Sequence, residues 1–245
     1  PGGVFWMGCN SVLDKQCQQN EKPQHNVLIS KPYWMDLHEV TVANFKACGA
    51  SGECGSPMNN ASTIDQSCKP GAPHANWTGN GPVTGREQHP VNCVTWANAK
   101  SYCTWAGGAL PTEAQWELAA RGNCMANGGL ACKSQMRTYP WGEATPKCGT
   151  HAVYSSGGLG CGKGTTWAVG TGSNSGRSPY GMLDMAGNVW EWAQDRFSSS
   201  YYKSSSTNDP VNTAGTAVHT FRGGGYFYGA VDVRTSDRGF SSQGG

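Results

Sequence analysis

The chain has 245 residues, of which 14% are charged, and its formal net charge is +2. This low and balanced charge argues against nucleic acid or an anionic membrane surface as the partner, and the length is ample for one hydrophobic core. No apolar run approaches the roughly 20 residues of a membrane-spanning helix.

The first third of the chain predicts two strands, a short helix and a long excursion. Alternating apolar residues favour strands over residues 4–8 and 26–36, and the segment that begins at residues 38–41 and contains Asn44 and Phe45 is expected to form a short helix. Residues 49–90 show no periodicity and are rich in Gly, Ser, Asn and Pro, which is typical of a long loop. The residues of the second strand expected to face a core are Val27, Ile29, Tyr33 and Trp34.

Two further helices are predicted in the middle of the chain. Residues 95–105 have a helical pattern, with Thr95 as the N-cap. A second helix is expected to open at Thr112, because Thr112 and Gln115 have the spacing of a capping box. Its acidic residues are interpreted as cap or surface positions: Glu113 and Glu117.

The rest of the chain indicates short strands and long loops. The whole chain contains 35 glycines and 10 tryptophans, a mixture that favours loops stabilised by aromatic clusters. We find no internal repeat and no linker. The predicted fold class is therefore one irregular α+β domain over residues 1–245, loop-rich with little regular secondary structure.

Eleven cysteines indicate an oxidising, extracytoplasmic location. They form no Cys-x-x-Cys pair and are not grouped with the histidines, which argues against a zinc site. Cys103 is left over, either because its partner is missing or because it is a buried free thiol. The expected disulfides are Cys9–Cys17, Cys48–Cys54, Cys68–Cys93, Cys124–Cys132 and Cys148–Cys161.

One turn combines two carboxylates with residues that tolerate positive φ. Asp184 and Glu191 bracket Gly187 and Asn188. Such a turn can point carbonyl oxygens inward, and carboxylates beside them would form a cage of hard oxygen ligands suited to Ca²⁺. The same residues are equally compatible with a tight turn whose carboxylates only accept backbone hydrogen bonds.

Residues 181–192 read Gly-Met-Leu-Asp-Met-Ala-Gly-Asn-Val-Trp-Glu-Trp. This stretch resembles the signature of the formylglycine-generating-enzyme, or sulfatase-modifying-factor, family. Other stretches similar to family motifs follow in the family's order along nearly the whole chain. They lie at residues 5–8, 39–41, 89–91, 94–96, 110–117, 139–142 and 222–224.

The resemblance implies a fold related to C-type lectins and a secreted, bacterial type of member. It also implies that the chain lacks the closing C-terminal strand of the family. One structural Ca²⁺ is expected by the same resemblance. Its ligands would be the side chains of Asp184 and Glu191 and the carbonyl oxygens of Gly187 and Val189.

The resemblance argues against copper chemistry in this chain. Catalytic members oxidise a substrate cysteine with O₂ at a copper ion that two cysteines bind, six and eleven residues after the Arg of an Arg-Gly-Gly turn. Counted from Arg222, these positions are Tyr228 and Val233. Cu(I) requires soft thiolate ligands, so copper is not expected here.

The segment in place of the copper site, residues 226–238, is a candidate binding surface. Aromatic and arginine side chains are frequent in recognition hot spots. An equally good interpretation is a core strand followed by Arg–Asp pairs that brace loops. The candidate surface residues are Tyr226, Tyr228, Asp232, Arg234 and Arg238.

Two functional hypotheses follow. The first is a non-catalytic, secreted or cell-surface module with a binding or structural role. Its partner would be a protein, a glycan or further copies of the chain in a homo-oligomer. The second is an extracytoplasmic oxidase or maturation enzyme of the same family that uses residues not identified here.

Overall fold

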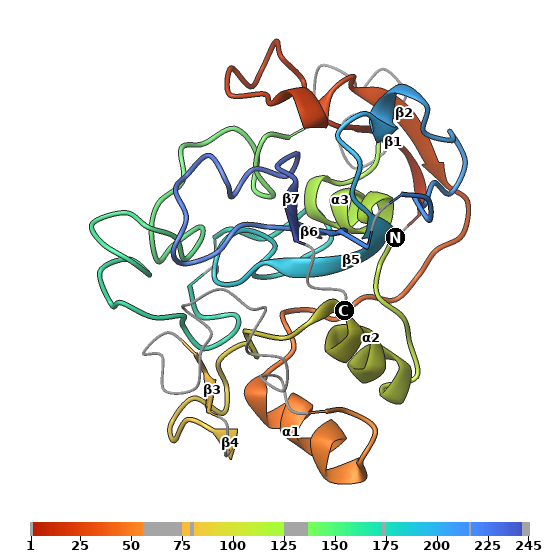
Figure 1. Ribbon diagram of the computed structural model, residues 1–245. Helices are drawn as coiled ribbons and strands as arrows, with labels where there is room; N and C mark the ends of the chain where they lie inside the picture. Colours follow the sequence, from red (N-terminus) through yellow and green to blue (C-terminus); the bar gives the residue numbers. More distant parts are fainter. Residues whose placement is uncertain are drawn as a thin grey trace.

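The computed structural model describes residues 2–55, 75–78, 81–124, 137–172, 175–215 and 217–241. Within these residues, short helices and small antiparallel sheets lie among long loops, which confirms the predicted α+β fold class (Figure 1). The helices are α1 (Val42–Ser51), α2 (Trp96–Trp105) and α3 (Glu113–Arg121), with 3-10 turns η1 (Gln19–Glu21) and η4 (Tyr201–Lys203). The strands are β1 (Gly3–Met7), β2 (His25–Ile29), β3 (Trp77–Thr78), β4 (Gly81–Pro82), β5 (Glu191–Arg196), β6 (His219–Arg222) and β7 (Gly239–Ser241).

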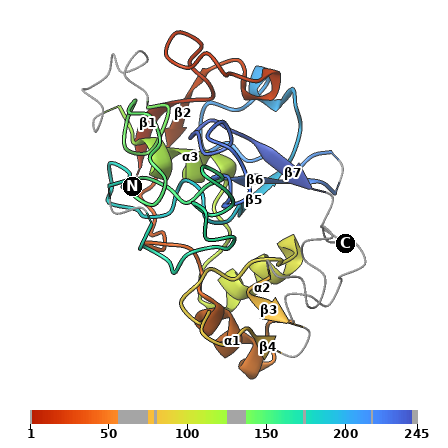
Figure 2. The same cartoon turned by 90° about the vertical axis from the view of Figure 1, so that its left-hand side faces the viewer.

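Helix α3 lies between the β1–β2 hairpin and the β5–β6–β7 sheet (Figures 1 and 2). Helices α1 and α2 and the β3–β4 ribbon lie together at the other end of the molecule. The last strand described, β7, pairs with β6 at one edge of the three-stranded sheet. The expectation that a further closing strand is missing stays a prediction.

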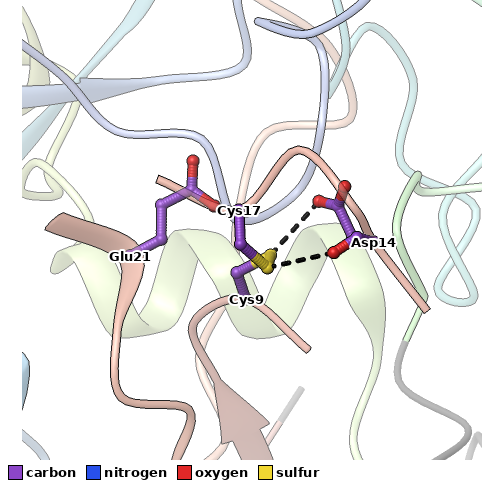
Figure 3. A group of neighbouring side chains, drawn as sticks. All are labelled: Cys9, Asp14, Cys17 and Glu21. Atoms are coloured by element: carbon purple, nitrogen blue, oxygen red, sulfur yellow. Dashed lines mark hydrogen bonds between the residues drawn. A yellow bond between two sulfur atoms is a disulfide. The ribbon is translucent and has the colours of Figure 1, made fainter. Parts of the chain in front are cut away.

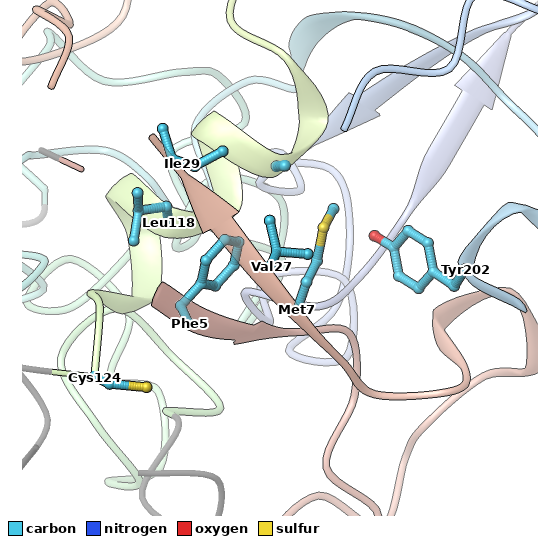
Figure 4. Packing of buried hydrophobic residues seen from close by; sticks show 8 residues of the cluster. Phe5, Met7, Val27, Ile29, Leu118, Cys124 and Tyr202 are labelled. Atoms are coloured by element: carbon cyan, nitrogen blue, oxygen red, sulfur yellow. The ribbon is translucent and has the colours of Figure 1, made fainter. Parts of the chain in front are cut away.

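The β1–β2 hairpin supplies one side of the core around α3. Phe5 pairs with Val27 in an antiparallel register, and both side chains are fully buried. They pack with Leu118 of α3, as Figure 4 shows. The second predicted strand is too long, because β2 ends at Ile29 and Trp34 is fully exposed.

Each helix begins directly after a capping threonine, as predicted for α2 and α3. Thr41 and Thr95 accept hydrogen bonds from the backbone N–H groups three residues later, at the starts of α1 and α2. At α3, Thr112 Oγ1 accepts from Gln115 N at 3.1 Å and Gln115 Oε1 accepts from Thr112 N at 2.8 Å. The predicted capping box is therefore formed.

Helix α3 is buried on nearly every side, and arginines neutralise its carboxylates. Arg222 of β6 contacts Glu113 at 2.7 Å and Glu117 at 2.6 Å. Arg238 contacts Glu113 at 2.7 Å, and Arg121 lies 3.0 Å from Glu117. Burial would raise the pKa of Glu113, but Arg238 and Arg222 outweigh burial and lower that pKa. The prediction that Glu113 and Glu117 are surface residues is wrong, because their partners come from distant segments.

The disulfides agree with the predicted pairing wherever both cysteines are described. Cys9–Cys17, Cys48–Cys54 and Cys148–Cys161 are formed. Cys93 and Cys124 are also disulfide-bonded, and their predicted partners, Cys68 and Cys132, lie outside the described residues. Cys103 is a free thiol.

In the described part of the chain, the helices are too short and too polar to cross a bilayer.

The buried ion network makes a prediction for stability. Arg222→Met removes a fully buried cation and leaves Glu113 and Glu117 incompletely neutralised. We expect the free energy of unfolding to fall by about 3–5 kcal/mol, measured by urea denaturation. Arg177→Met, at an exposed arginine, is the matched control and should change stability by less than about 0.5 kcal/mol. Equal losses in the two variants would contradict a structural role for the network.

Candidate functional site

The predicted turn is present, and its backbone adopts the left-handed region at three positions. Asp184, Gly187 and Asn188 have φ values of +56°, +84° and +60°. Asn188 connects the turn to two other segments. Its Oδ1 accepts a hydrogen bond from Trp167 N at 2.9 Å, and its Nδ2 donates to Glu39 Oε2 at 2.7 Å.

Glu39 belongs to this site, which sequence reasoning missed. Its second carboxylate oxygen accepts a hydrogen bond from Val189 N at 2.9 Å, so the side chain binds the turn from 150 residues away. Burial raises the pKa of Glu39 well above its ordinary value, and the nearby carboxylates of Asp184 and Glu191 raise it further. No local spacing in the sequence could reveal this contact, because 150 residues separate Glu39 from Val189.

Three carboxylates therefore lie close enough to repel one another: Glu39, Asp184 and Glu191. Burial raises the pKa of Glu191 to about 8, Asp184 adds to this, and a hydrogen bond from Trp116 Nε1 at 3.0 Å opposes it. No arginine or lysine contributes to the pKa shift of Glu39 or to that of Glu191. Buried carboxylates such as Glu39 and Glu191, whose charge no arginine or lysine offsets in these contributions, are chemically suited to a hard divalent cation.

The carbonyl donors predicted for that cation are available. Among the described residues, the carbonyl oxygens of Gly187 and Val189 accept no hydrogen bond, whereas that of Asn188 accepts one from Tyr226 N. Asp184 accepts from Gly170 N through one carboxylate oxygen. Carboxylate and carbonyl oxygens are ligands for Ca²⁺ and unsuitable for Cu(I), so the residues present fit the expected calcium ion and not copper.

A more compact group of ligand-type side chains lies elsewhere and has a structural role. Cys9, Asp14, Cys17 and Glu21 have atoms within 4.8 Å of one another (Figure 3). The two cysteines form a disulfide. Arg234 contacts Asp14 and Glu21, each at 2.7 Å. A guanidinium already neutralises this group, so we do not assign a metal to it.

The candidate binding surface needs correction, because most of its residues are buried. Arg234 and Arg238 are 0% and 4% exposed, and their guanidinium groups neutralise internal carboxylates. Tyr226 is also buried, at 7%. Asp232 accepts a hydrogen bond from Gly229 N at 3.0 Å and so braces its own loop. Of the predicted set, Tyr228 is an exposed aromatic residue, at 41%.

A small aromatic surface remains around Tyr228. The Tyr228 ring packs edge-on against Trp190 at 5.3 Å between centroids. The neighbouring Phe227 is 49% exposed. Val233, in contrast, is fully buried in an apolar cluster with Ala152 and Tyr154. The two residues that the family resemblance places at the copper-ligand positions therefore have different environments, one at the surface and one in the core.

The close approach at Gly187 makes a testable prediction. A Cβ added there would overlap the carbonyl oxygen of Val153, and φ is +84°. Gly181, in the same stretch, has a φ of +81° but open space around it. Gly181→Ala should lose about 1–2 kcal/mol of stability from backbone strain, and Gly187→Ala about 1–3 kcal/mol more. Thermal or urea unfolding measures both, and similar losses would contradict the packing argument.

Comparisons with known proteins agree with the motifs. The model of the sulfatase-modifying factor enzyme 1-like domain matches residues 1–245. The formylglycine-generating enzyme of Thermomonospora curvata is 34% identical over 91% of this chain and 78% of that protein. The enzyme of Streptomyces coelicolor is 32% identical over 92% of this chain and 77% of its own. The structure of PvdO from Pseudomonas aeruginosa matches 98% of this chain with 86% of the PvdO chain, at 21% identity and a TM-score of 0.73. This similarity shows that the two proteins share a fold. The chain thus belongs to the formylglycine-generating-enzyme, or sulfatase-modifying-factor, family.

Proposed function

We propose that this domain is a non-catalytic, extracytoplasmic member of the family with a binding or structural role. The observation that carries the proposal is the pair of residues at the copper-ligand positions, Tyr228 and Val233. Val233 offers only hydrocarbon and is fully buried. Tyr228 carries a hard phenol oxygen, whereas Cu(I) prefers soft sulfur ligands.

The cysteines elsewhere do not replace the missing pair. Every described cysteine except Cys103 is disulfide-bonded. Burial raises the pKa of Cys103 to about 11, and Asp36 adds to the shift, so this thiol is poor as a thiolate ligand at neutral pH. One thiol of this kind cannot provide the two-thiolate site that copper-dependent oxidation uses.

The binding role is supported by the aromatic surface at the position of the lost copper site. Phe227 and Tyr228 expose large rings next to the partly buried Trp190. Rigid aromatic side chains are frequent anchors in interfaces. The partner we propose is a protein, a glycan or another copy of the chain.

A turnover assay tests the non-catalytic assignment. The protein, reconstituted with copper, is incubated in air with a cysteine-containing peptide, and oxygen consumption and peptide mass are followed. We expect no conversion of cysteine to formylglycine, because the site lacks both thiolates. The Thermomonospora curvata enzyme under identical conditions is the positive control. Turnover would overturn the proposal and favour the enzymatic alternative.

We also propose that one Ca²⁺ stabilises the turn. Asp184 and Glu191 would supply carboxylate oxygens, and Gly187 and Val189 would supply carbonyl oxygens. Glu39 lies against the same turn and would add negative charge to the site. The ion would neutralise this buried group of carboxylates, a structural contribution that requires no catalytic step.

Chelation tests the calcium proposal. Excess EDTA should lower the melting temperature by several degrees, because an ion that binds only the folded state at 100 times its Kd contributes about 2.7 kcal/mol. The effect should be larger at pH 8.5 than at pH 6. Burial raises the pKa of Glu191 to about 8, so at pH 6 the ion must displace a bound proton.

Two variants complete the calcium experiment. Glu191→Gln retains an acceptor for Trp116 but loses the charge, and should remove most of the response to EDTA. Glu53→Gln is the control, because Glu53 is exposed and outside the site. An EDTA-independent melting temperature, together with no calcium in elemental analysis, would refute this site.

A further inference from the structure

A cavity of about 660 Å³ opens beside the proposed calcium site, between the loop at residues 33–40, helix α2 and the segment 183–192. This volume is within the range of small-molecule sites in proteins. Its described lining lacks Phe227, Tyr228 and Val233. The cavity therefore lies beside the aromatic surface around Tyr228 without including its two exposed rings, and Trp190 borders both.

The charge of the lining has one sign. Three carboxylates line the cavity: Asp36, Glu39 and Glu191. No arginine or lysine is among the described residues that line it. The one basic side chain is His38, whose Nδ1 is hydrogen-bonded to the Glu39 carbonyl oxygen. A divalent ion at the turn would leave the exposed Asp36 carboxylate uncompensated.

The end of helix α2 adds to this negative potential. Ala106, Gly107 and Gly108, which follow the last helical residue, line the cavity. The carboxyl end of a helix carries partial negative charge, and α2 has no basic residue in its last turn to offset it. The Asp36 carboxylate acts on neighbouring side chains in the same cavity. After burial, it is the next largest contribution that raises the pKa of both Tyr102 and Cys103.

The walls are aromatic and apolar. Trp34 is fully exposed, and Tyr102 and Phe45 are stacked with centroids 5.8 Å apart. Aromatic faces attract cations, most strongly where water is excluded. The aromatic lining residues are Tyr33, Trp34, Phe45, Tyr102, Trp190 and Trp192.

We propose that this cavity binds an organic cation, an ammonium or guanidinium group on an aromatic or aliphatic body. Asp36 and the carboxyl end of α2 would attract the charge, and the aromatic walls would pack against the body. A neutral or anionic compound of the same shape would lose the electrostatic attraction and keep only the packing against the aromatic walls. The inference goes beyond the proposed function, and it relies on Asp36 and the end of α2, whose negative charge remains whether or not an ion occupies the turn.

Cys103 provides a native reporter, because it lines the cavity and is a free thiol. The folded protein is treated with 2-aminoethyl methanethiosulfonate, a cation, or 2-sulfonatoethyl methanethiosulfonate, an anion. Each rate of modification of Cys103 is divided by the rate of the same reagent with free cysteine. We expect the cation to react at least about tenfold faster after this normalisation.

Asp36→Asn should reduce the cation preference several-fold, and Glu53→Gln should leave it unchanged. Both substitutions are at exposed residues, so both variants are expected to fold. In a second measurement, 2-phenylethylammonium should protect Cys103 from modification at a concentration where 2-phenylethanol does not. Ala99→Trp, which fills the cavity from α2, should abolish this protection.

Equal normalised rates for the two reagents would overturn the proposal. So would equal protection by the ammonium and the alcohol. The reactions are run at pH 9, where part of the thiol is ionised. Failure of both reagents to modify Cys103 there, while the urea-unfolded protein reacts, would also overturn the proposal, because the cavity would then be closed to solutes.

Discussion

The fold depends on the neutralisation of buried carboxylates on α3 by arginines from the end of the chain. Glu113 and Glu117 are inaccessible to water, and Arg222 contacts both. An uncompensated carboxylate at such positions would cost several kcal/mol. The hairpin, the helix and the three-stranded sheet can therefore pack only when β6 has been brought to α3. Arg238, just before β7, reinforces the same junction through Glu113.

The candidate site is attached directly to this junction. Trp116 of α3 donates a hydrogen bond to Glu191, the first residue of β5. Gly223, which follows Arg222, accepts a hydrogen bond from Gly187 N through its carbonyl oxygen. The turn therefore receives its position from the same helix and strand that the arginine joins. Its own residues provide the local conformation, whereas the ion network provides the surroundings that bury its carboxylates.

Features set by neighbouring residues could be predicted from the sequence, and features set by distant ones could not. The capping box at Thr112, the described disulfides and the turn at Gly187 depend on spacings of a few residues. The positions of Glu39 and Arg234 depend on partners more than 100 residues away, at Val189 and Glu21. The prediction that Trp34 faces a core failed for another reason, because alternation alone does not show where a strand ends. Motif resemblance identified the family, since it draws on the whole chain.

The contrast among the acidic groups explains why a cation is expected at the turn. Glu113 and Glu117 have Arg222, and Asp14 and Glu21 have Arg234. Among the described residues, no arginine or lysine forms a salt bridge with Glu39 or Glu191, and burial, reinforced by the neighbouring carboxylates, raises the pKa values of both. Carboxylates that are buried without an arginine, as Glu39 and Glu191 are, must be neutralised by protons or by an added cation. The proposed metal follows from that difference at the turn, whereas the proposed organic cation follows from the exposed Asp36 and the end of α2 in the adjacent cavity.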